Sequence, residues 1–242
     1  MTGTFVIDAL PERAVRYRTD HIIVAVDVFR ASTTIVTALA GGRRVYPADG
    51  VSDALELAAR LPGATLAGEL AGLRPAGFAV NNSPAVIAAS TDRGPLILIS
   101  SAGTRLLGSA RGAPAVYVAC FRNLTATSNH LIRASGSIAL IGAGARGQSR
   151  PEDSMACARI GQALLDAGFL PEDDRTRAEL AQWADVEIAS VREGPSADFL
   201  RSTGQEADID FVIEHVDDLE MVVSYDGREA VVNAASRLEL SQ

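Results

Sequence analysis

Four short stretches of the sequence combine carboxylates, arginines, hydroxyls and glycines in patterns suited to binding a metal ion and a phosphate group. The first stretch, VDVFRAST, places Asp27 three residues before Arg30, with Ser32 and Thr33 following. Carboxylates are ligands for hard cations such as Mg²⁺, and the planar guanidinium makes two-point contacts with phosphate. Asp27 and Arg30 could thus serve a metal ion and an anion from one turn. The alternative is an exposed ion pair, which contributes little stability.

Three further stretches offer acids, an amide, hydroxyls and glycines with accessible backbone N–H groups. They are AGELAGLRPAGFAVNNSP, ISSAGTR and GAGARGQSRPED. The candidates are Glu69, Asn82 and Ser83 in the second stretch, Ser101, Gly103 and Thr104 in the third, and Gly144, Gly147, Glu152 and Asp153 in the fourth. Each stretch follows an apolar run. In α/β sheets such positions lie beyond the carboxyl ends of strands, where ligands bind and helix N-termini favour anions.

Several of these candidates also have an ordinary structural interpretation. Ser83 and Thr104 both suit the N-cap of a helix. Glu152 stands three residues after Ser149, as in a capping box, and Asp153 would complement the dipole of the same helix. Taken one at a time, the structural interpretation is the preferred one for Ser83, Glu152 and Asp153, and Thr104 fits a structural and a functional role equally well.

The stretch GAGARG matches the G-x-G-x-x-G pattern of dinucleotide-binding loops at Gly142, Gly144 and Gly147. A nicotinamide site would also need a helix beginning within the loop and an acid at the end of the next strand, about 20 residues on. The sequence has neither feature. A glycine-rich anion loop is the better interpretation.

Composition excludes several kinds of chemistry. The chain has no lysine, so a Walker-type phosphate loop, a Schiff-base lysine and a pyridoxal phosphate site are all excluded. The formal net charge of −8 argues against nonspecific nucleic-acid binding. Cys120 and Cys157 have no metal-ligand spacing, and no G-x-S-x-G nucleophile motif occurs. Phe29 stands where an aspartyl-nucleophile phosphatase has its second acid.

Apolar runs and helical spacing alternate along the chain, which indicates an α/β fold with helices on both faces of a parallel or mostly parallel sheet. Strands are predicted at residues 21–28, 43–48, 64–69, 95–101, 115–121 and 137–143. Helices are predicted at 52–61, capped by Ser52 or Asp53, at 82–90, capped by Ser83, and at 149–168, capped by Ser149.

The C-terminal part, residues 171–242, has a different pattern. Residues 172–194 and 206–219 have helical character, and 220–227 with 228–234 could form a closing pair of strands. No Pro-, Gly- or Ser-rich linker precedes this part, so residues 1–242 are interpreted as one domain, compatible with two similar α/β halves. No apolar run is long enough to span a membrane and no leader peptide is recognised. A cytoplasmic location is therefore expected, and the apolar fraction of 48% is compatible with a homodimer.

Together and in this order, the four stretches resemble the 2-phosphosulfolactate phosphatase family. The resemblance implies a three-layer α/β/α fold with a largely parallel or mixed sheet, and a Mg²⁺-dependent phosphatase acting on a small phosphorylated anion. The chain departs from the family pattern at three positions. Leu70 replaces an arginine, Ala79 replaces an acid, and Ala102 replaces an asparagine.

We therefore expect a Mg²⁺-dependent phosphomonoester hydrolase acting on a substrate like 2-phosphosulfolactate. Asp27, Glu69, Glu152 and Asp153 are the expected metal ligands or water-orienting groups, and Arg30 would neutralise phosphoryl charge. Ser32, Thr33, Asn82, Ser83, Ser101, Gly103, Thr104, Gly144 and Gly147 are the expected substrate-binding residues. Two alternatives stay open because of the departures. One is a weakened or inactive anion-binding homologue, and the other is an enzyme acting on a phosphonate or another phosphorylated carboxylic acid.

Overall fold

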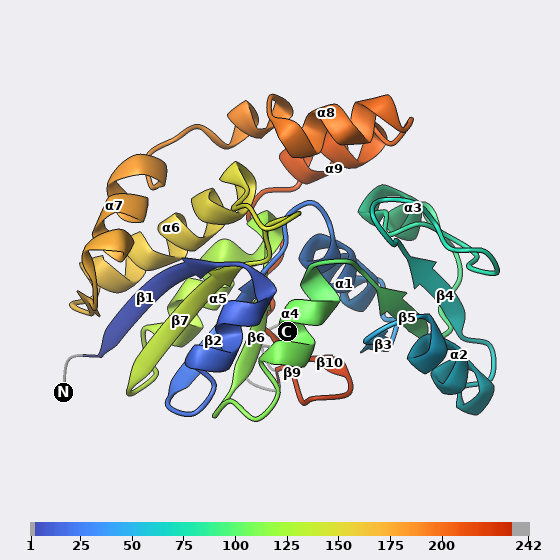
Figure 1. Cartoon of the computed structure of the whole chain (residues 1–242), viewed down its shortest axis with the longest axis horizontal. Coiled ribbons are helices and arrows are strands. Elements are labelled where there is room, and N and C mark those ends of the chain that lie inside the picture. The colour runs from blue at the N-terminus through green and yellow to red at the C-terminus, as the bar shows by residue number, and fades with distance from the viewer. Residues whose placement is uncertain (1–2, 234–242) are drawn as a thin grey trace.

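The computed structural model describes residues 3–233, which form a mixed β-sheet with helices on both faces (Figure 1). The strands are β1 Thr4–Ala9, β2 His21–Val26, β3 Val45–Pro47, β4 Thr65–Gly68, β5 Leu96–Ile99, β6 Val116–Ala119, β7 Ser137–Gly142, β8 Leu170–Pro171, β9 Val223–Tyr225 and β10 Ala230–Val232. The α-helices are α1 Ala31–Ala40, α2 Val51–Arg60, α3 Pro84–Ala89, α4 Gly103–Ser109, α5 Leu124–Leu131, α6 Pro151–Asp166, α7 Asp174–Trp183, α8 Pro195–Ser202 and α9 Ala207–Glu214. Short 3₁₀ helices are η1 Pro11–Arg16, η2 Phe121–Asn123 and η3 Ile188–Arg192.

Within residues 3–233, the ten strands follow the order β4-β5-β3-β10-β9-β6-β2-β7-β1-β8. Neighbouring strands from β8 to β6 are parallel, and so are β4, β5 and β3. The antiparallel hairpin β9–β10 lies between these two blocks, because β9 pairs with β6 and β10 pairs with β3. The middle of the sheet is therefore built from the C-terminal part of the described chain.

Side chains of the central strands alternate between two apolar clusters, one on each face of the sheet. Ile23 and Ala25 of β2 belong to a cluster that includes residues of α1 and α4. Val24 and Val26 belong to a second cluster, which includes residues of α5 and α6. A strand covered on both faces needs consecutive apolar residues, which explains the uninterrupted run HIIVAV and confirms the predicted α/β class.

The predicted strands all form, as β2 to β7, and the predicted C-terminal strand pair forms as β9 and β10. The pair does not close an edge of the sheet but lies inside it. The sequence interpretation missed β1, which pairs with β7, and the two-residue β8 at the edge.

The predicted helices form, but only one of the three predicted caps is correct. Ser83 caps α3, and its hydroxyl accepts a hydrogen bond from the Val86 N–H at 3.2 Å. Helix α2 begins at Val51 with Gly50 as its N-cap, so neither Ser52 nor Asp53 can cap it. Helix α6 is preceded by Arg150 and begins at a proline, which suits the first helical position. The Ser149 capping box is therefore wrong by one residue.

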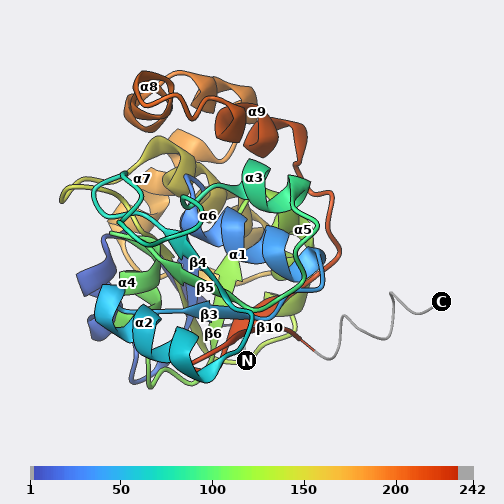
Figure 2. The same cartoon turned by 90° about the vertical axis from the view of Figure 1, so that its right-hand side faces the viewer.

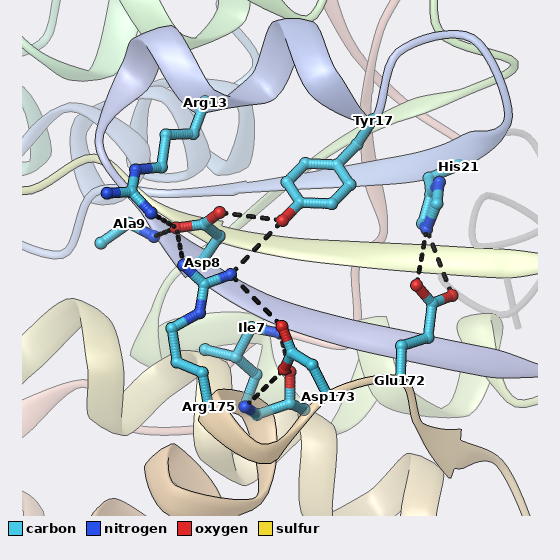
Figure 3. Close-up of polar contacts among 10 residues, drawn as sticks. Ile7, Asp8, Ala9, Arg13, Tyr17, His21, Glu172, Asp173 and Arg175 are labelled. Atoms are coloured by element: carbon cyan, nitrogen blue, oxygen red, sulfur yellow. Dashed lines mark hydrogen bonds and ion pairs between the residues drawn. The ribbon is translucent and has the colours of Figure 1, made fainter.

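A buried carboxylate fixes the end of β1 (Figure 3). The Asp8 carboxylate accepts hydrogen bonds from Arg175 at 2.7 Å, from the Tyr17 hydroxyl at 2.9 Å and from Arg13 at 3.3 Å. Burial of Tyr17, followed by its contact with Asp8, raises the pKa of the Tyr17 hydroxyl. The network joins β1, η1 and the first turn of α7, and so acts as a structural clamp.

The C-terminal region lies across one end of the sheet. Helices α8 and α9 pack together, α9 lies next to α3 (Figures 1 and 2), and the chain then returns to the middle of the sheet as β9 and β10. Among the described residues, no helix combines the length and the apolar character needed to cross a bilayer.

Candidate active site

Segments that follow β2, β4, β5 and β7 surround a cavity of about 240 Å³. Its lining includes four of the carboxylate, amide and hydroxyl residues proposed from the sequence, namely Asp27, Glu69, Asn82 and Ser101. Arg30 and Gly144 also line it. Residues separated by more than 100 positions in the chain thus share one cavity. This is the arrangement expected at the carboxyl ends of strands in α/β folds.

Asp27 directly follows β2 and is held by the turn after it. Its backbone N–H donates to the Ser32 hydroxyl at 2.9 Å, and the Thr33 hydroxyl donates to the Val28 carbonyl at 2.8 Å. Ser32 and Thr33 are buried and do not line the cavity. They hold the turn after Asp27 in place and do not face the cavity. The sequence analysis had expected both residues to bind substrate.

The Asp27 carboxyl group is in an environment that disfavours its negative charge. Its pKa is raised to about 7, chiefly by burial and also by the nearby Glu69 and Glu152, while the Ala31 N–H and Arg30 oppose the shift. A buried carboxylate surrounded by other acids is a location where a cation would be strongly stabilised.

Asp153 lies behind Asp27 and joins two of the loops. Its Oδ1 accepts the Val28 N–H and its Oδ2 accepts the Gly144 N–H, both at 2.9 Å. Burial, followed by repulsion from Asp27 and Glu152, raises the pKa of Asp153. Asp153 is 4% exposed and is outside the cavity lining. It therefore connects the loops that follow β2 and β7 without facing the cavity.

Glu69 and Glu152 approach Asp27 from other elements. The Glu69 carboxylate accepts the Ser101 N–H at 2.6 Å and the Ser101 hydroxyl at 3.0 Å, and it also accepts the Gly72 N–H. Burial raises the pKa of Glu152, which accepts a hydrogen bond from Ser196. Within the described residues, no three acidic, histidine or cysteine side chains are grouped closely enough to hold a metal ion by themselves.

Arg30 is buried but does not pair with Asp27. Its Nη1 donates to Asp208 Oδ2 at 2.6 Å and to Gln205 Oε1 at 2.6 Å, and both side chains of the Arg30–Asp208 pair are at most 4% exposed. The exposed Asp27–Arg30 ion pair considered from the sequence is therefore wrong. Asp208 also accepts from the Ser83 hydroxyl at 2.6 Å, so Ser83 contacts α9 and not the cavity.

Residues that the sequence interpretation did not select complete the cavity. Arg146 and Arg150 line it, and neither side chain has a hydrogen bond or an ion pair within residues 3–233. The Arg146 guanidinium lies 5.8 Å from the ring centroid of Phe199 in α8. Ser196 and Phe199 also line the cavity, so helix α8 covers one side of it. Helical spacing had indicated α9 but no helix at residues 195–202, where α8 forms, and helical spacing does not reveal this contact.

Asn82 supplies an oxygen without a partner. Its side chain lines the cavity and is 2% exposed, and its Oδ1 has no hydrogen-bond partner among the described residues. A buried acceptor without a donor costs free energy, and a cation would compensate it. Together with the Asp27 carboxyl group, it makes an oxygen donor set that fits a hard divalent cation.

The start of α4 packs directly against Asp27. A Cβ atom on Gly103 would overlap Asp27 Oδ2, so only glycine permits this approach. Thr104 points away, because its hydroxyl accepts the Ser100 N–H at 2.9 Å. Gly147 is not part of the cavity lining. The four loops selected from the sequence therefore all contribute to the lining of this cavity, but the sequence did not distinguish lining residues from supporting ones.

The three departures from the family pattern lie in different environments. Leu70 and Ala79 are exposed and do not line the cavity. Ala102 lines it and immediately precedes α4. Of the three positions where a departure was expected, Ala102 is therefore the one that lies in the cavity itself.

Comparison with known proteins gives a consistent result over most of the chain. A family model described as 2-phosphosulpholactate phosphatase matches residues 8–228. A probable 2-phosphosulfolactate phosphatase of Synechococcus sp. (strain JA-2-3B'a(2-13)) is 34% identical over 213 residues, which cover 83% of this chain and 86% of the relative. A protein of Carboxydothermus hydrogenoformans with the same description is 30% identical over 182 residues, covering 75% and 73% of the two chains. The chain therefore belongs to the 2-phosphosulpholactate phosphatase family.

Proposed function

We propose that the protein is a Mg²⁺-dependent phosphomonoester hydrolase acting on a small anionic substrate such as 2-phosphosulfolactate. One observation carries the proposal. The buried Asp27 carboxyl group and the unpartnered Asn82 oxygen line the same cavity as Arg146 and Arg150, which have no ion pair among the described residues. Oxygen donors for a cation thus lie beside cationic donors for an anion.

The oxygen donors would hold the metal ion. Asp27 and Asn82 are the proposed direct ligands, and Glu69, Glu152 and Asp153 supply the surrounding negative charge. When bound, Mg²⁺ would withdraw charge from the phosphoryl oxygens and favour attack by water.

The protein groups would bind and orient the substrate. Arg146 and Arg150 would contact the phosphate and the second acidic group, since guanidinium groups match tetrahedral and planar oxyanions. The backbone at the start of α4 presents the positive end of its helix dipole beside Asp27. Phe199 and the rest of α8 would exclude bulk water, which strengthens these electrostatic interactions.

Ala102 favours a second candidate function, in which the enzyme acts on a different substrate. An alanine in the cavity, where related sequences have an asparagine, removes a hydrogen-bonding group and leaves space. A phosphorylated carboxylic acid or a phosphonate is therefore the second candidate substrate. The exposed positions of Leu70 and Ala79 argue that these two departures leave the cavity intact.

Phosphate release from a panel of small phosphate esters tests the proposal. The purified protein should release phosphate from phosphosulfolactate or a related acid with Mg²⁺ and lose this activity with EDTA. Release only from phosphorylated carboxylic acids would favour the second candidate. Binding of esters without any turnover would identify an inactive anion-binding homologue and reject the hydrolase.

A further inference from the structure

A second cavity, of about 190 Å³, lies at the C-terminal end of α1 and has no lining residue in common with the first cavity. It lies between the last turn of α1, α3 and α9, which Figure 2 shows close together. Its polar lining consists of Thr37, Arg43, Arg93, Arg122 and His215. No carboxylate of the described residues lines it.

Arg43 lines this cavity and has N–H groups that form no hydrogen bond among the described residues. Its side chain is 2% exposed, its Nε donates to the Gly94 carbonyl at 2.8 Å, and its Nη2 contacts Asp92 at 3.1 Å. Its Nη1 forms no hydrogen bond among the described residues. Burial lowers the pKa of Arg43, and the neighbouring Arg93 lowers it as well, while Asp92 opposes the shift.

Arg122 and His215 are held in place by bonds that leave other donors free. Arg122 makes a two-point contact with Asp218 at 3.0 and 2.6 Å, and its Nη1 donates to Thr37 Oγ1 at 2.9 Å. His215 Nδ1 donates to the Phe211 carbonyl at 2.8 Å. This bond places a proton on Nδ1 and leaves Nε2, which has no partner among the described residues, available to a ligand.

Arg93 adds a cation that is not neutralised by a carboxylate. Its guanidinium donates to the backbone carbonyls of Ser90 and Asp92 at 2.8 and 3.1 Å. Within residues 3–233 it forms no ion pair. The cavity therefore holds more positive charge than its carboxylate neighbours balance.

We propose that this second cavity binds a small divalent oxyanion, such as inorganic phosphate or the head group of a phosphomonoester. Guanidinium groups bind such oxyanions through paired hydrogen bonds. The cavity volume of about 190 Å³ is enough for one phosphate group. The Phe211 ring, stacked on His215 with centroids 4.1 Å apart, forms an apolar wall.

Helix α9 links this cavity to the first one. Asp208, Phe211 and His215 are spaced three and four residues apart, so they share one face of the helix. Asp208 holds Arg30 in the first cavity, while Phe211 and His215 line the second. An anion bound in the second cavity would thus restrain the helix that positions Arg30.

Equilibrium dialysis with labelled inorganic phosphate, in EDTA, tests the site separately from catalysis. The background protein carries Arg146→Glu and Arg150→Glu, which remove phosphate binding from the first cavity. We expect this protein to bind one phosphate per chain. Adding Arg93→Glu or, separately, His215→Ala should weaken binding at least tenfold. Arg133→Glu, at an exposed arginine that lines neither cavity, should leave it unchanged.

Hydrogen exchange provides a second readout. Phosphate should slow amide exchange in residues 207–214 of the background protein and not after Arg93→Glu. The proposal is overturned if the background protein binds no phosphate up to about 10 mM, tenfold above a Kd of about 1 mM. It is also overturned if Arg93→Glu and His215→Ala bind as tightly as the background, or if Arg133→Glu weakens binding equally. None of these results depends on whether the protein is a phosphatase.

Discussion

Asp208 in α9 forms a buried ion pair with Arg30, 178 residues earlier in the chain, with 2.6 Å between Oδ2 and Nη1. The same carboxylate accepts from the Ser83 hydroxyl at the start of α3. One side chain of the C-terminal region therefore connects two of the loops that form the first cavity.

We expect Asp208→Ala to destabilise the protein by about 3–5 kcal/mol, because it leaves the buried Arg30 charge without its partner. The activity that survives should have a lower kcat. Asp210→Ala is the matched control, since Asp210 is in the same helix but pairs with Arg192 at an exposed position. That change should cost at most about 1 kcal/mol. Equal losses in urea unfolding would contradict the assigned role of Asp208.

Asp27→Asn should abolish Mg²⁺-dependent phosphate release while the metal-free protein becomes more stable. The folded-state pKa of about 7 is above the ordinary value, so the ionised carboxylate opposes folding most strongly above pH 7. The gain at pH 8 should be on the order of 4 kcal/mol and should disappear near pH 3, where the carboxyl group is almost fully protonated in both states. Thermal unfolding with and without Mg²⁺ measures both effects. Added Mg²⁺ should stabilise the wild type and not the variant, and equal stabilisation would remove Asp27 from the metal site.

Gly103→Ala should disturb the site through sterics alone. The added methyl group would overlap Asp27 Oδ2 and lie 2.5 Å from the Ala31 Cβ, so α4 would have to move away from Asp27. We expect a loss of kcat of at least tenfold and a destabilisation of about 1–3 kcal/mol. Gly50→Ala serves as the control, because a methyl group added there would meet no atom within 4 Å. If both variants keep wild-type kcat, the close approach has no catalytic importance.

Arg150→Ala should raise KM more than it lowers kcat, since the side chain is proposed to bind the substrate anion. A rise of about tenfold corresponds to about 1.4 kcal/mol of lost binding. The double change Arg146→Ala, Arg150→Ala should cost more than either alone. Arg133→Ala, at an exposed position outside the cavity, should leave both constants unchanged. Steady-state kinetics that show a change in kcat alone would reject the binding role.

Asp8→Ala should separate stability from function. The change leaves Arg175, Arg13 and the Tyr17 hydroxyl without their shared acceptor. A loss of about 3 kcal/mol in unfolding free energy is expected, with kcat unchanged at a temperature where the variant is folded. A drop in kcat under those conditions would show that the β1 clamp also positions the active site.

The sequence allowed the strands and the participating loops to be predicted, because both depend on local patterns. Strands covered on two faces require continuous apolar runs, and polar residues at their carboxyl ends mark where ligands bind. Asp27 and Glu69 were proposed in this way, and both line the first cavity. Asp208 and Phe199 could not be found, because their contacts depend on how α8 and α9 fold back over distant loops. The cap at Ser149 failed because Pro151 decides where α6 begins.

The hairpin β9–β10 has a consequence for the order of assembly. During synthesis the β8-to-β6 block and the β3–β5–β4 block emerge first, yet neither has its inner neighbour until residues 223–232 are available. Both blocks would meanwhile present an unpaired strand edge, on β6 and on β3. The β9–β10 hairpin then inserts between the two blocks and joins the two half-sheets into one. We therefore expect the sheet to fold cooperatively only after residues 223–232 have left the ribosome.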